Sequence, residues 1–66
     1  MGRKSERAMY LARRGRTRKF GGKTYKFASW QPTKGEARDS KIYHQTRGWN
    51  VRVVPDGGGY SIYTRG

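Results

Sequence analysis

Residues 49–65 read WNVRVVPDGGGYSIYTR, and this stretch decides the fold. Two β-rich runs, residues 49–54 and 60–65, flank a segment of Pro, Asp and Gly that is typical of a turn. The stretch therefore predicts a hairpin whose side chains alternate between two sides. The apolar side is expected to hold Val51, Val53, Tyr60 and Ile62. The other side is expected to hold Arg52, Ser61, Tyr63 and Arg65.

A second hairpin is predicted nearer the N-terminus. Gly21-Gly22 is a strong signal for a two-residue hairpin turn, and it follows Phe20 directly. The strand after this turn alternates, with Tyr25 and Phe27 on one face and Thr24, Lys26 and Ala28 on the other. Pro32 is expected to end this strand.

Between the two hairpins, Thr33 and Glu36 have the spacing of a capping box, which predicts a helix that begins at Lys34. Gly48 is the expected C-terminal stop. Neither face of this helix is strongly apolar, so a strand over residues 41–46 with a turn at Arg47-Gly48 is the alternative.

These elements predict an α+β fold, a small four-stranded antiparallel sheet in the order hairpin, helix, hairpin (ββαββ), with one helix on one face. Such sheets commonly leave their second face in contact with water. We expect the helix to cover Tyr25, Phe27, Val51, Val53, Tyr60 and Ile62, with Phe20 or Trp49 closing an end. The open face is expected to carry Lys26, Arg52, Tyr63 and Arg65, with Lys23 and Trp30 near its edge.

Residues 1–18 are predicted to be a flexible basic arm, and residues 19–66 the folded body. Residues 1–19 hold eight Lys or Arg and one acid, which gives a charge of +7. A short helix over residues 5–14, capped by Ser5 and ended by Gly15, is the alternative. An isolated helix of fewer than about 12 residues is marginal in water.

Four short segments resemble a pattern found in small basic archaeal and archaeal-virus proteins. These segments are residues 20–25 (FGGKTY), 33–37 (TKGEA), 48–54 (GWNVRVV) and 59–65 (GYSIYTR). The family pattern is written F-x-G-K-x-Y, T-K-x-E-A, G-[YW]-x-V-R-V-V and Y-x-[VI]-Y-x-R. The resemblance covers residues 20–65, implies ββαββ order and assigns no activity. Lys41 and His44 depart from it, because they occupy helix positions where apolar residues are expected.

The formal net charge of +12, from sixteen Lys or Arg against four acids, points to a polyanionic partner. We expect nucleic acid, with duplex DNA favoured because strands and Arg-rich arms enter its grooves. RNA, including a ribosome-associated role, is one alternative, and an acidic protein partner is another. The predicted binding residues are basic or aromatic and are Arg13, Arg14, Arg16, Arg18, Lys19, Lys23, Lys26, Trp30, Arg52, Tyr63 and Arg65. Trp30 and Trp49 flank the predicted helix. They are expected either to close the ends of the core or to offer an exposed surface for stacking.

Several classes of function are not expected. The chain has no Cys and one His, His44, so we expect no disulfide, no metal site and no cofactor. No acid, base and nucleophile can be assembled into a catalytic group, so an enzyme is not expected. Gly57-Gly58-Gly59 precedes a strand and therefore is not a phosphate loop. No apolar run approaches the roughly 20 residues of a membrane span, and we expect a cytoplasmic, nucleoid- or ribosome-associated protein.

Overall fold

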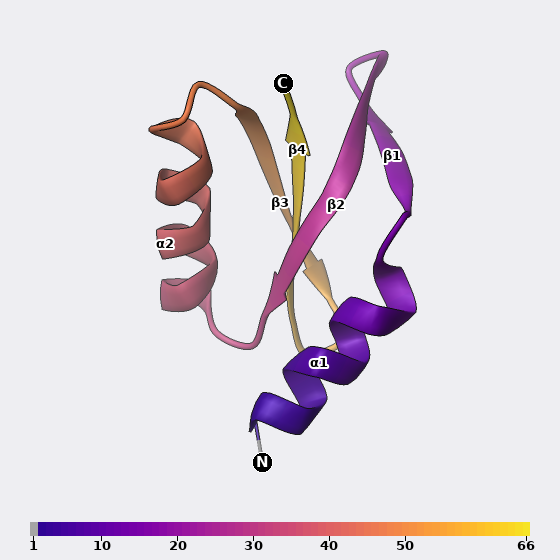
Figure 1. Cartoon of the computed structure of the whole chain (residues 1–66), viewed down its shortest axis with the longest axis vertical. Coiled ribbons are helices and arrows are strands. Elements are labelled where there is room, and N and C mark those ends of the chain that lie inside the picture. The colour runs from indigo at the N-terminus through magenta and orange to yellow at the C-terminus, as the bar shows by residue number, and fades with distance from the viewer. Residues whose placement is uncertain (1) are drawn as a thin grey trace.

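The computed structural model describes residues 2–66, and side chains from residue 7 onward. Its elements in chain order are α1 (Gly2–Arg13), β1 (Thr17–Phe20), β2 (Lys23–Gln31), α2 (Lys34–Gln45), β3 (Asn50–Asp56) and β4 (Gly59–Arg65). All strand pairs are antiparallel, and the sheet order is β1-β2-β4-β3. The predicted α+β class and hairpin–helix–hairpin order are confirmed (Figure 1).

Two-residue glycine turns close both hairpins. Gly21 and Gly22 have φ of 58° and 80°, and Gly57 and Gly58 have φ of 58° and 85°. Positive φ at both central residues is the mark of a type I′ turn, whose twist matches that of the flanking strands. β3 runs on through Pro55 to Asp56, beyond the predicted end at Val54. An edge strand tolerates a proline because its outer side needs no backbone donor.

The helix α2 begins and ends as the sequence predicts. The Thr33 hydroxyl accepts a hydrogen bond from the Glu36 amide at 3.2 Å and donates to the Glu36 carboxylate at 3.0 Å. At the other end, the Gly48 amide donates to the Gln45 carbonyl and the Trp49 amide to the His44 carbonyl, with Gly48 at φ 84°. These two bonds form a Schellman motif. The alternative strand over residues 41–46 is wrong.

The predicted assignment of β2 to the two faces of the sheet is wrong. Phe27 lies opposite Tyr63, and Lys26 lies opposite Thr64. Tyr25 and Phe27 therefore share a face with Arg52 and Tyr63, whereas Lys26 shares the face of Val51, Val53 and Ile62 that α2 covers. A bulge at Ala28 then reverses the parity of β2, so Trp30 returns to the face of Phe27. We call these the aromatic face and the α2 face.

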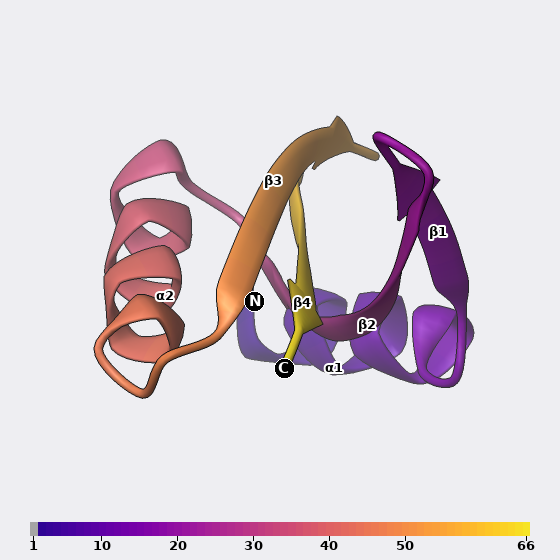
Figure 2. The same ribbon diagram turned by 90° about the horizontal axis from the view of Figure 1, so that it is seen from above.

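On the aromatic face, the sheet curls around its own aromatic side chains. The Phe20 ring lies 5.2 Å from that of Tyr25 and 5.8 Å from that of Tyr63, and the Tyr63 ring lies 5.8 Å from that of Phe27. Figure 2 shows the edge strands β1 and β3 facing each other across the concave side. Tyr63 and Trp30 are buried here, and Ile62 is fully buried on the α2 face.

The basic arm is more structured than predicted. Helix α1 crosses one end of the sheet (Figure 1), where the Tyr10 ring lies 5.8 Å from that of Phe27. The helix starts at Gly2 rather than at residue 5, and the predicted cap by the Ser5 side chain lies outside the described side chains. The boundary predicted between residues 18 and 19 falls inside β1, because Thr17 pairs with Lys26 and Arg18 with Tyr25.

We expect Gly59→Ala to destabilise the fold and Gly35→Ala to stabilise it. A Cβ at Gly59 would overlap the Trp30 ring and the Gln31 carbonyl oxygen, whereas a Cβ at Gly35 meets nothing within 4 Å. Overpacking of this kind costs about 1–3 kcal/mol, and Ala in place of an exposed helical Gly gains about 0.5–1 kcal/mol. Urea unfolding of both variants measures the two effects. Equal stability of the two variants would contradict the close approach of β4 to Trp30.

Candidate nucleic-acid interface

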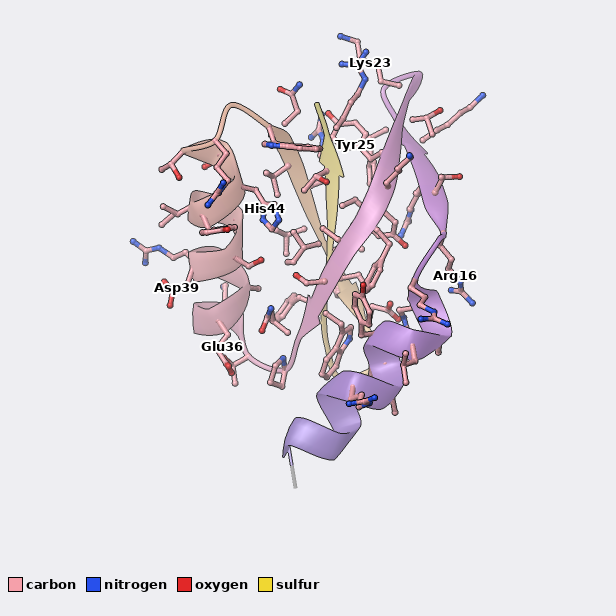
Figure 3. The ribbon with its side chains drawn as sticks, in the orientation of Figure 1. Arg16, Lys23, Tyr25, Glu36, Asp39 and His44 are labelled. Carbon is pink, nitrogen blue, oxygen red and sulfur yellow. The ribbon has the colours of Figure 1, made fainter. Side chains whose placement is uncertain are left out.

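Acidic and basic side chains are unevenly distributed along the chain. Residues 7–35 hold nine Lys or Arg and no acid. The acids beyond this segment are Glu36 and Asp39 on α2, and Asp56 at the end of β3. Figure 3 shows Arg16 on the side of the molecule opposite Glu36 and Asp39, and Lys23 at the end where the β1–β2 hairpin turns. A polyanion would therefore meet the hairpin of β1 and β2 without opposing charge.

This hairpin and the loop before it carry six exposed cations, which we call the basic ribbon: Arg14, Arg16, Arg18, Lys19, Lys23 and Lys26. Strand alternation directs Arg18 to the aromatic face and Lys19 to the α2 face. Lys23 stands at the tip beside the turn (Figure 3). The charges therefore surround the ribbon on both faces rather than forming one flat patch.

Arg52 joins Arg18 from the opposite edge of the curled sheet. The Arg18 guanidinium lies 5.4 Å from the centre of the Phe20 ring, and the Arg52 guanidinium lies 5.9 Å from it. Arg52 also lies 6.0 Å from the centre of the Tyr25 ring. Cation–π contacts at these distances orient both guanidinium groups while leaving their N–H donors free for a ligand.

Two of the predicted binding residues have little surface to offer a ligand. Trp30 is 6% exposed, and its indole N–H donates to the Asp56 backbone carbonyl at 2.8 Å. Tyr63 is 5% exposed and lies between Phe20 and Phe27. The expectation that both aromatic rings lie on or beside an open face is therefore wrong. Trp30 instead follows the alternative in which it closes the core.

Arg13 is committed to an internal ion pair. Its guanidinium forms two hydrogen bonds with Asp56, one of them from Nη2 at 2.9 Å, and Asp56 also accepts a bond from the Ser61 hydroxyl. The bonds from Arg13 and then from Ser61 hold the pKa of Asp56 below its usual value of 3.8. This pair fastens α1 to the β3–β4 hairpin, so Arg13 contributes little charge to a partner.

Lys26 and Arg65, both expected on the open face, share a basic surface with Trp49, which was expected to close an end of the core. They border a groove together with Thr24, Thr64 and Trp49, on the part of the sheet that α2 does not cover. Trp49 is 44% exposed and follows the Gly48 stop of α2 directly. Because Trp49 directly follows the glycine that ends α2, the sequence already indicated an aromatic ring near the end of the sheet.

The described residues offer little support for a metal site, a reactive histidine or a membrane-spanning helix. Among them, no group of three or more His, Cys, Asp or Glu could hold a metal ion. His44 contacts the Ser40 carbonyl oxygen through Nδ1 at 2.8 Å, as part of the helix. None of the helices in residues 2–66 has the length and apolar character needed to cross a membrane.

The chain matches no family model, no curated protein and no solved structure. The resemblance to small archaeal proteins therefore stays a prediction, and the function has to be argued from the surface itself.

We expect Asp56→Asn to lower the free energy of unfolding at neutral pH and to make that free energy less dependent on pH in the acidic range. Because the folded-state pKa of Asp56 is lowered, its stabilisation is present above about pH 4 and is lost as the pH falls through the lowered value. The loss at pH 7 should be about 1–2 kcal/mol. Urea unfolding at pH 7 and at about pH 2 measures both effects. The control is Asp39→Asn on the exposed side of α2, and an equal effect of the two substitutions would contradict the role of the ion pair.

Proposed function

We propose that this protein binds duplex DNA through the basic ribbon, with Arg52 beside it. The observation that carries the proposal is the exposure of all six ribbon cations on a segment that contains no acid. Each phosphate that these side chains neutralise releases a condensed counterion, which favours binding without any sequence preference. We therefore expect the protein with DNA in the cytoplasm, as a nucleoid-associated protein.

The shape of the ribbon supports a duplex partner. The major groove of B-DNA is about 12 Å wide and admits a two-stranded β-ribbon. β1 has no strand on its outer side, and residues 23–25 of β2 pair with β1 alone, so the tip of this two-stranded hairpin extends beyond β4 (Figure 1). Cations on both faces of the hairpin, such as Arg18 and Lys19, then reach the phosphates on the two walls of the groove.

The burial of aromatic rings argues against single strands as the main ligand. Proteins that bind single-stranded nucleic acid stack successive bases on exposed aromatic side chains. Here Tyr25, Trp30 and Tyr63 are buried, and Phe20 lies under two guanidinium groups. The exposed rings of Tyr10, Tyr43 and Trp49 lie on α1, on α2 and just after α2, rather than in a row along the ribbon. A-form RNA helices offer a deep, narrow major groove that a ribbon does not enter. Duplex DNA is the ligand that these features favour.

We expect binding to a DNA duplex to weaken steeply with salt. If the six cations neutralise about five to six phosphates, log K falls against log salt with a slope near −5. The triple variant Arg16→Gln, Arg18→Gln, Lys19→Gln should bind more weakly, with a slope shallower by about 3. Fluorescence anisotropy of a labelled duplex across a salt series gives both values.

The matched control removes the same charge elsewhere, by Lys34→Gln, Arg38→Gln and Lys41→Gln on α2. We expect this variant to keep the wild-type slope, because its cations lie outside the ribbon. Equal weakening by the two triple variants would show that only net charge matters. Tighter binding of single-stranded DNA or of an RNA hairpin than of duplex would overturn the choice of ligand.

A further inference from the structure

A second cationic region lies between α2 and β3, away from the ribbon. Lys34, Arg38 and Lys41 lie four and three residues apart on α2, so they share one side of the helix. They border a groove against β3 and β4 that has no acidic lining residue. Glu36 and Asp39 line a different cleft, on the other side of α2. Among the described side chains, these three cations have no ion-pair partner.

The floor of this groove is apolar. It is formed by Val53 and Pro55 of β3 and by Tyr60 of β4, of which Pro55 is exposed and the other two are half-buried. Ala37 is the buried residue of α2, and its small side chain leaves the groove unfilled. A larger apolar residue at position 37, or an apolar residue in place of Lys41, would fill this groove.

Cations around an apolar floor fit a different ligand from the one that the ribbon fits. A DNA duplex is too wide to enter this groove, so it would rest on the rim and leave the floor exposed to water. An acidic segment of a partner protein can place one or two apolar side chains on Val53 and Tyr60 while its carboxylates reach the cations. Charge complementarity favours that partner, and burial of the apolar side chains adds to the affinity.

We propose that the groove between α2 and β3 docks a short acidic segment of a partner protein, with an apolar residue at its centre. This site is independent of the proposed DNA binding. Because β1 and α2 lie at opposite sides of the molecule (Figure 1), a duplex on the ribbon leaves the groove open. Recruitment of an acidic partner to DNA is the role of this groove that rests on the proposed DNA binding, whereas peptide docking itself does not.

The test uses two fluorescein-labelled peptides of equal charge, Glu-Asp-Leu-Phe-Asp-Glu and Glu-Asp-Gly-Ser-Asp-Glu. We expect the first to bind at least about tenfold more tightly, since it alone buries apolar side chains on the floor. In nuclear magnetic resonance spectra of the full chain, it should shift the amides of Ala37, Lys41 and Val53 and leave those of the ribbon in place.

Two variants separate the groove from the ribbon. The α2 triple variant, Lys34→Gln, Arg38→Gln and Lys41→Gln, should bind the peptide at least about tenfold more weakly. The ribbon triple variant, Arg16→Gln, Arg18→Gln and Lys19→Gln, should bind the peptide as tightly as the wild type. Pro55→Ser changes the exposed edge of the floor and should weaken only the Leu-Phe peptide. A folded spectrum for each variant shows that the loss is local.

Three results would overturn this inference. Equal binding of the two peptides, or shifts centred on the ribbon, would reduce the groove to a charged surface. No binding of the Leu-Phe peptide at millimolar concentration would exclude the site for this ligand chemistry. Stronger groove shifts with an oligonucleotide than with the peptide would assign it to nucleic acid. None of these results depends on whether the ribbon triple loses duplex binding.

Discussion

Phe27 lies opposite Tyr63 where β2 pairs with β4, and the extra residue at Ala28 then brings Trp30 opposite Ser61. This register collects five aromatic side chains on one face, Phe20, Tyr25, Phe27, Trp30 and Tyr63, and places Val51, Val53 and Ile62 on the other with Tyr60. The aromatic face curls until Phe20 on one edge strand meets Arg52 on the other. The α2 face stays shallow enough for a helix that presents only Ala37 as a buried residue. In a chain with so thin a core, the partition of side chains decides which cations remain exposed.

The parts of the fold that could be predicted depend on short segments of sequence. Glycine pairs specify the two type I′ turns, and Thr33 with Glu36 specifies the start of α2, because each device closes its own hydrogen bonds within a few residues. The parity of β2 against β4 is different, because α2 and β3 separate the two strands in the chain. Both faces of β2 carry mixed side chains, so no local pattern reports the bulge at Ala28. Arg13 and Asp56 lie 43 residues apart, and nothing in the arm indicates their pairing.

The same error in parity changed the expected candidate site. A flat open face with Lys26 beside Arg52 and Tyr63 would have offered aromatic rings to unpaired bases. In the structure, Lys26 and Arg52 lie on opposite faces and Tyr63 is buried. The cations Arg14, Arg16, Arg18, Lys19 and Lys23 keep the exposure that their polar surroundings predicted, because charged side chains are almost never buried without a partner. Composition therefore predicts that the surface is cationic. Which cations lie together on that surface can be predicted only when the pairing register of β2 against β4 is known.

The acids of the described chain show why so much positive charge remains free. Asp56 is occupied by Arg13 and Ser61, where it fastens α1 to the sheet. The Glu36 carboxylate accepts a hydrogen bond from the Thr33 hydroxyl in the first turn of α2, where a carboxylate also favours the helix dipole. Only Asp39 has no such structural contact. Because Asp56 is neutralised by Arg13, only Glu36 and Asp39 among the described acids are left to offset the exposed cations of the ribbon and of the groove beside α2. An anionic partner of the kind proposed above would relieve the self-repulsion of those cations, which the acids of the described chain leave uncompensated.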